Sequence, residues 1–140
     1  MVYEKLITLA ATKIGVPLSL LMAICSHESG GLNNIYVPDD KGTPSHGICQ
    51  VKSDTAIMFG YKGTKEELMI PKNNINVAAK YLKYQMDRYD NDWCKAAAAY
   101  NAGTYFPSKK NRGKPTNYGY IKKVSKYLEE ELHEHLECDE

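Results

Sequence analysis

Apolar side chains recur at intervals of three and four residues through most of the chain, which is the spacing of one face of an α-helix. The pattern predicts a first helix through residues 6–14, ended by Gly15. It predicts a second helix whose first turn contains Pro17 and which runs to about Ser29, before the glycine pair at 30 and 31.

The segment 31–49 is rich in Gly, Asn, Pro and Asp, which is typical of a long loop. A loop of that length inside a compact domain is often functional. Two short helices are expected after it. Ser53 or Asp54 could cap the first, which reaches Phe59, and Thr64 with Glu67 forms the pattern of a capping box for the second.

The second half of the chain predicts three longer helices. Asn73 or Asn74 could open the first, Asp92 could cap the alanine-rich segment 93–102 that Gly103 ends, and the last begins near Tyr118. The sequence therefore predicts a mainly α, single domain over residues 1–140, with strand structure confined to a short β-hairpin near residue 47.

Length and charge narrow the classes of function. The chain has 140 residues, 43% of them hydrophobic, which suits one compact domain with its own core. A net charge of +1 argues against an overall electrostatic grip on nucleic acid. The longest apolar stretch, residues 16–25, is too short to span a membrane, so we expect no membrane insertion. We also expect the protein to be a monomer.

Four cysteines, at positions 25, 49, 94 and 138, allow three pairings that the sequence does not distinguish. A domain of this length does not depend on disulfides for stability, so buried free thiols are the expectation.

Glu28 is an acidic residue on an apolar helix face. It follows Ile24 by four residues, Leu21 by seven and Leu20 by eight, and these positions share one side of an α-helix. Burial favours the protonated carboxyl and raises its pKa, and the nearby helix C-terminus acts in the same direction. A carboxylic acid that keeps its proton near neutral pH is what cleavage of a glycosidic bond requires. A solvent-exposed glutamate at a helix end is nevertheless the commoner case. Whether Glu28 is catalytic therefore has to be judged from the residues that follow it in the chain.

Three downstream segments carry residues suited to a sugar ligand, at 45–51, 98–103 and 118–124. Gly47 permits close approach of backbone to a ligand. Gln50 and Asn101 have amides that both donate and accept hydrogen bonds. Tyr100 and Tyr120 offer a flat apolar face and a hydroxyl, which suit a pyranose ring.

In this order the motifs resemble the soluble lytic transglycosylase family, relatives of goose-type lysozyme. The resemblance covers roughly residues 3–128 and includes Glu-Ser, Gly-Ile-x-Gln, Ala-x-Tyr-Asn-Ala-Gly and Gly-Tyr-Ile-Lys-x-Val. It implies a lysozyme-like fold with a glycan cleft, near which the hairpin would lie, and Glu28 as the single catalytic acid/base. The implied substrate-binding residues are Ser29, Ser45, Gly47, Ile48, Gln50, Tyr100, Asn101 and Tyr120.

The implied substrate is the glycan strand of peptidoglycan. Glu28 would protonate the bond between N-acetylmuramic acid and N-acetylglucosamine and then act as base while the muramoyl 6-hydroxyl closes onto C1. The product is a 1,6-anhydro sugar, and neither a metal nor another cofactor is needed.

Three departures from the family pattern bear on the site. Cys49 stands where methionine is usual, and the loop 39–44 differs from the usual one. Pro115 precedes Thr116 where many relatives have glutamate.

Hydrolysis by a muramidase is the nearest alternative reaction. It typically needs a second carboxylate, for which Asp39, Asp40 and Asp54 are candidates, although loop and cap roles suit these residues better. A catalytically silent glycan-binding protein is a further alternative, but it would commonly have lost Glu28.

A zinc-binding module would use Cys25, His27, His46 and Cys49. On a helix, however, Cys25 and His27 point about 200° apart. His133 and His135 have the same spacing problem and are expected on the surface.

The resemblance places the protein at the bacterial cell wall, in the periplasm or outside the cell. The N-terminus does not resemble a secretory leader. We therefore expect a phage-delivered or virion-associated protein, a secretion accessory protein of a mobile element, or a mature form. The basic loop 109–114 could help to hold an anionic wall.

Overall fold

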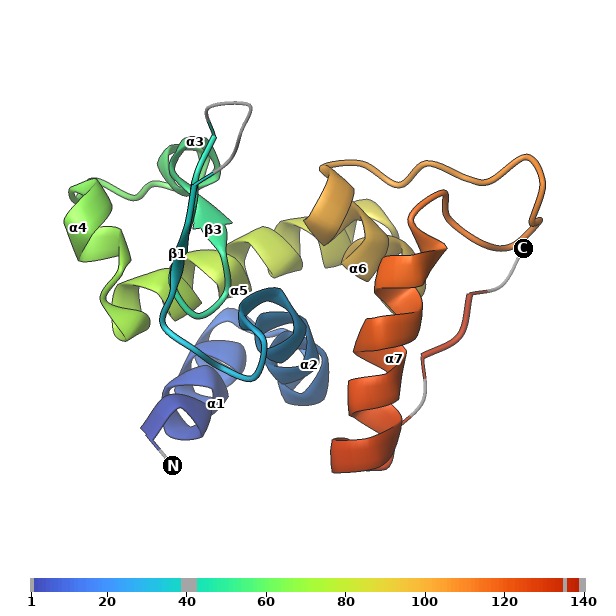
Figure 1. Cartoon of the computed structure of the whole chain (residues 1–140), viewed down its shortest axis with the longest axis horizontal. Helices are drawn as coiled ribbons and strands as arrows, with labels where there is room; N and C mark the ends of the chain where they lie inside the picture. The colour runs from blue at the N-terminus through green and yellow to red at the C-terminus, as the bar shows by residue number, and fades with distance from the viewer. Residues whose placement is uncertain (1, 39–42, 135, 139–140) are drawn as a thin grey trace.

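The computed structural model describes residues 2–38, 43–134 and 136–138, and these form a helical domain with one small sheet (Figure 1). The elements are, in chain order, α1 (Val2–Ile14), α2 (Leu18–Ser29), β1 (Tyr36–Val37), β2 (Ser45–His46), β3 (Val51–Lys52), α3 (Ser53–Met58), α4 (Lys65–Leu68), α5 (Pro71–Arg88), α6 (Trp93–Ala102) and α7 (Tyr118–Leu132). The mainly α fold is as predicted from the sequence.

Helix α5 runs through the middle of the domain and packs against α1 on one side and α6 on the other (Figure 1). Helix α2 packs between α1 and α7. The apolar faces predicted from the spacing meet in this core, where Leu20, Leu21, Ile24, Leu82 and Leu128 have no exposed surface. Helix α2 is thereby held in place by contacts with α1, α5 and α7.

The sheet is antiparallel with strand order β1-β2-β3. Tyr36 pairs with His46, and Ser45 pairs with Lys52. The hairpin predicted near residue 47 is therefore present as β2 and β3, and β1 adds a strand within the segment predicted as loop. The residues that join β2 to β3 form the turn 47–50, which reaches back toward α2.

Local signals predicted some helix starts correctly. Thr64 and Glu67 form the capping box, with both reciprocal hydrogen bonds present. Asp92 caps α6 by accepting a hydrogen bond from the Lys95 N–H at 3.0 Å.

Two predicted caps were wrong. Helix α3 begins at Ser53 after an N-terminal flank at Lys52, with no side-chain cap. Helix α5 begins at Pro71, earlier than predicted, so Asn74 lies inside the helix. Its side chain is engaged in tertiary hydrogen bonds instead of capping the helix.

All four cysteines are paired, which corrects the expectation of free thiols. Cys25 of α2 is bonded to Cys49 of the turn, and Cys94 of α6 is bonded to Cys138 in the C-terminal segment. The Cα atoms are 4.1 Å apart in the first pair and 5.2 Å in the second. The partners are distant in sequence, so only tertiary packing brings them together. Within the described residues no helix is long and apolar enough to cross a membrane.

Candidate active site

Glu28 lies in the last turn of α2. The helix ends at Gly30, whose left-handed backbone (φ 68°) is the usual conformation for the residue that closes a helix. The chain before Glu28 is fully buried at Leu21 and Ile24, while Glu28 itself is half-buried. The predicted face therefore exists, and it directs the carboxyl from the core toward the edge of a cavity.

The pKa of Glu28 is raised from 4.5 to about 7, and burial is the main cause. Two neighbours oppose this effect and lower the pKa: the Tyr120 hydroxyl and the charge of Lys52. Tyr120 is close enough to act on the carboxyl as a donor, although its buried hydroxyl falls short of a well-formed hydrogen bond. The carboxyl can therefore hold or release a proton near neutral pH.

Glu28 opens into a cavity of about 320 Å³. Residues from three parts of the chain line it: Glu28 from α2; Ser45, Gln50, Val51, Lys52 and Thr55 from the sheet, its β2–β3 turn and α3; and Tyr81, Tyr100, Asn101, Ala102 and Gly103 from α5, α6 and the residue after α6. Among the described lining residues Glu28 is the only carboxylate. A larger groove lies along α7 but contains none of these residues. The smaller cavity is therefore the candidate site.

Cys49 fixes the turn that forms one wall of the cavity. Its backbone N–H donates to the Asn74 side-chain oxygen at 2.9 Å, and its carbonyl accepts from the Tyr100 hydroxyl at 3.1 Å. Its side chain is bonded to Cys25, one helical turn before Glu28. Three helices, α5, α6 and α2, thus hold this one residue.

Asn74 is the centre of this arrangement, and the sequence analysis assigned it only a capping role. Its side-chain nitrogen donates to the carbonyls of His46 at 2.7 Å and Leu68 at 3.0 Å. It also explains Gly47, because a Cβ atom there would lie 2.6 Å from the Asn74 nitrogen. The backbone at Gly47 is close to Asn74, a protein group, rather than to an open ligand site.

Gln50 has positive φ (51°), an uncommon conformation for a residue other than glycine. Its side-chain nitrogen donates to the carbonyls of Ile35 at 3.0 Å and Gly47 at 2.9 Å. These bonds fix the amide, and its oxygen is the group that remains for a ligand in the cavity.

The transglycosylase SLT domain model matches residues 5–122. The chain belongs to the transglycosylase SLT family. Protein IpgF of Shigella flexneri is 35% identical over 105 residues, which are 74% of this chain and 68% of that protein. The soluble lytic murein transglycosylase of Escherichia coli K12 is 32% identical over 94 residues, which are 63% of this chain.

Solved structures agree with this assignment. The 70 kDa soluble lytic transglycosylase of Escherichia coli matches with a TM-score of 0.60 and 28% identity over 72% of this chain. An inactive mutant of the lytic transglycosylase Slt from Pseudomonas aeruginosa matches with a TM-score of 0.58 and 25% identity over 69%. The chain spans 14% of the E. coli murein transglycosylase and 16–17% of these two solved chains. The lysozyme-like SLT fold predicted from the sequence is thus confirmed.

In this SLT domain, five of the predicted site residues line the cavity: Glu28, Ser45, Gln50, Tyr100 and Asn101. Ser29, Gly47, Ile48 and Tyr120 do not line it. Ser29 is buried, and its hydroxyl donates to the Cys25 carbonyl and accepts from the Asn33 N–H, both at 3.0 Å. Ile48 has no exposed surface.

Six further residues line the cavity and were not predicted as site residues: Val51, Lys52, Thr55, Tyr81, Ala102 and Gly103. Asn117, which was not predicted either, lies beside Asn101. The Tyr81 ring lies 5.0 Å from that of Tyr100, within the family motif segment 98–103. The Asn117 side chain donates to the Asn101 side-chain oxygen at 2.9 Å and to the Ala98 carbonyl at 3.1 Å. Apolar spacing along α5 gave no signal that Tyr81 faces a cavity.

The structure also places the residues on which the muramidase and zinc-binding alternatives depend. Asp39 and Asp40 lie outside the described residues, and Asp54 is exposed on α3 and does not line the cavity. The disulfide occupies both thiols of the proposed zinc set, and no group of three metal-binding side chains occurs among the described residues. His27 instead packs edge-on against Tyr120, with ring centres 5.1 Å apart.

Proposed function

We propose that this domain is a peptidoglycan lytic transglycosylase that cleaves the β-1,4 bond from N-acetylmuramic acid to N-acetylglucosamine and forms the 1,6-anhydro product. Glu28 is the single acid/base. The observation that supports this most is a carboxyl with a pKa of about 7 in a cavity whose other described lining residues include no carboxylate. Family membership and the likeness to lytic transglycosylases give independent support.

The reaction uses the Glu28 carboxyl twice. In the first step its proton goes to the leaving glycosidic oxygen, the C1–O bond breaks, and positive charge develops at C1 of the muramoyl residue. In the second step the Glu28 carboxylate removes the proton from the muramoyl 6-hydroxyl while that oxygen bonds to C1. Glu28 regains its proton, and no water is consumed.

A pKa near 7 suits both steps, because the group must give up a proton and then take one back. Lys52 and Tyr120 stabilise the Glu28 carboxylate, which exists between the first and the second step. A second carboxylate would favour hydrolysis instead, since it could act as a nucleophile or activate water.

The other predicted site residues divide into two roles. Gln50, Asn101 and Ser45 present polar groups to the sugar hydroxyls and N-acetyl groups, and the Tyr100 ring forms an apolar wall. Ser29, Gly47 and Ile48 shape the site from inside the protein. A monomeric state and a phage or mobile-element origin stay predictions from the sequence.

Product identity tests the reaction. We expect mass spectrometry of digested peptidoglycan to show anhydromuramic ends, each lighter by one water than a reducing end. Reducing-end muramic acid as the main product would replace this proposal with hydrolysis by a muramidase.

A substitution tests the residue. The variant Glu28→Gln should lose cell-wall clearing activity while keeping its fold. The inactive Pseudomonas aeruginosa enzyme likewise carries glutamine in place of a glutamate. Glu66→Gln is a matched control, because Glu66 is exposed on α4. Full activity in Glu28→Gln would refute the assignment.

A further inference from the structure

Positive charge is segregated in one part of this chain. Residues 93–128 contain eight basic and no acidic residues: Lys95, Lys109, Lys110, Arg112, Lys114, Lys122, Lys123 and Lys126. Since the whole chain has a net charge of +1, the remainder carries −7. The net charge therefore conceals a basic region on the loop between α6 and α7 and on the first half of α7, whose last turn carries Glu129, Glu130 and Glu131.

The loop that carries half of these residues has a regular hydrogen-bonded base. Pro107 pairs with Pro115, the Ser108 N–H donates to the Lys114 carbonyl at 2.9 Å, and the Thr116 N–H donates to the Phe106 carbonyl at 2.8 Å. Lys109, Lys110 and Arg112 lie at its tip and are exposed. The loop extends along one edge of the domain (Figure 1), and these contacts give its exposed cationic tip an ordered base.

The base of this loop is tied to the rim of the candidate active site. The loop leaves α6 directly after Asn101 and Ala102, and it returns at Asn117, whose side chain donates to Asn101 at 2.9 Å. A strand that occupies the cavity at Asn101 therefore passes the root of the loop.

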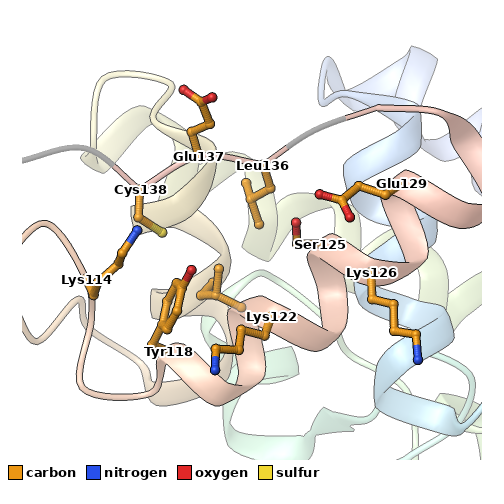
Figure 2. A pocket seen from close by; sticks show the side chains of 10 residues that line it. Lys114, Tyr118, Lys122, Ser125, Lys126, Glu129, Leu136, Glu137 and Cys138 are labelled. Atoms are coloured by element: carbon orange, nitrogen blue, oxygen red, sulfur yellow. The ribbon is translucent and has the colours of Figure 1, made fainter. Parts of the chain in front are cut away.

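A groove of about 500 Å³ continues the basic surface along α7 toward the C-terminal segment. At one end the ammonium groups of Lys114 and Lys122 lie 4.9 Å and 5.5 Å from the centre of the Tyr118 ring (Figure 2). Glu129 and Glu137 also line the groove, so it presents both signs of charge (Figure 2).

We propose that the loop tip (Lys109, Lys110, Arg112) and the groove along α7 form an anchoring surface for the peptide stems of the glycan strand held in the active site. This inference rests on the proposed function. Stems carry several carboxylates and, where they include a diamino acid, an ammonium group. The basic tip suits the carboxylates, and the mixed charge of the groove suits a zwitterionic peptide better than a purely anionic polymer.

Binding to purified sacculi tests the surface. The sacculi are first freed of phosphodiester polymers by acid, and half are then amidated with carbodiimide and ammonia to neutralise the carboxylates. The protein is the full chain carrying Glu28→Gln, so that the sacculi stay intact. The test variant adds Lys109→Glu, Lys110→Glu and Arg112→Glu. The matched control adds Lys62→Glu, Lys65→Glu and Lys72→Glu, an equal charge change at exposed positions around α4 and the start of α5.

We expect the loop variant to bind untreated sacculi about tenfold more weakly at low salt, with the difference shrinking as salt screens the charges. The control should bind as the parent does, and the parent should bind amidated sacculi about as weakly as the loop variant binds untreated ones. With Glu28 restored, the loop variant should keep its activity only on short soluble glycan fragments from which the peptide stems have been removed.

Unchanged affinity of the loop variant, or an equal loss in the control, would overturn the proposal. So would full binding to amidated sacculi, binding only where phosphodiester polymers remain, or tighter binding to duplex DNA than to sacculi. Because binding is measured without turnover, failure of the Glu28 mechanism would appear separately, as retained activity of Glu28→Gln.

Discussion

The hydroxyl of Tyr100 donates a hydrogen bond to the backbone carbonyl of Cys49 across 3.1 Å, from α6 to the turn that bears Gln50. Tyr100→Phe keeps the ring in the cavity and leaves that buried carbonyl without this donor. We expect a loss of about 1–3 kcal/mol in the free energy of unfolding and a fall in kcat, because the position of Gln50 depends on the turn. Tyr84→Phe, on the exposed face of α5, is the control and should change neither value.

The pH dependence of activity should report Glu28. The first step needs the protonated carboxyl, so kcat/KM should fall as pH rises through the pKa of about 7. Tyr120 lowers that pKa, so Tyr120→Phe should move the alkaline limb of the profile to higher pH. A limb that stays in place or moves to lower pH would contradict this role of the Tyr120 hydroxyl.

Glu28 should also lower stability at alkaline pH. Its pKa is 4.5 as an ordinary carboxyl and about 7 in the fold, so the folded state binds more protons between these values and stability falls as pH rises across them. Above this window the full penalty is about 3 kcal/mol, and below it the penalty vanishes. Glu28→Gln should therefore be more stable than the parent at about pH 8 and equal to it at about pH 4 in denaturant titrations. Equal stability at both would mean that the carboxyl is not buried as described.

Asn74 should be essential for the turn. Asn74→Ala removes one acceptor and two donated hydrogen bonds from the backbone at Cys49, His46 and Leu68. We expect a loss of about 2–4 kcal/mol in unfolding free energy, together with a drop in kcat larger than any change in KM. The neighbouring Asn73→Ala breaks one exposed bond to the Glu67 carbonyl and should cost much less. Equal effects of the two changes would argue against the central place of Asn74.

The disulfides should be measurable directly. Unfolded, unreduced protein should show no reactive thiol, because Cys25 is paired with Cys49 and Cys94 with Cys138. Replacing Cys25 and Cys49 together by Ala should lower the free energy of unfolding by about 3 kcal/mol. Thiol titration and thermal denaturation test the two statements, and four reactive thiols would contradict the pairing.

Local chemistry was readable from the sequence. Thr64 with Glu67, Asp92 and Gly30 act on backbone groups within a few residues, so their roles follow from spacing alone. Glu28 belongs here too, because its burial follows from the periodicity of α2.

Tertiary roles were not readable in the same way. Asparagine is a residue type that often caps helices, but the hydrogen-bond partners of Asn74 are 6, 25 and 28 residues away in the chain. Gly47 was predicted to let the backbone approach a ligand, but the group that lies close to it is the Asn74 side chain. The prediction of free thiols was wrong for a related reason. The paired cysteines are 24 and 44 residues apart, and such separations leave no local pattern in the sequence.

The fastening of Cys49 by α2, α5 and α6 has a consequence for how the domain folds. Its backbone N–H, its carbonyl and its sulfur each need a different helix in place, so the turn 47–50 can close only after those helices have docked. Its amide hydrogen should accordingly exchange with solvent only through the largest opening of the domain. A catalytically competent molecule is then also a fully folded one, and early collapsed forms of the chain would carry Glu28 without a cleft around it.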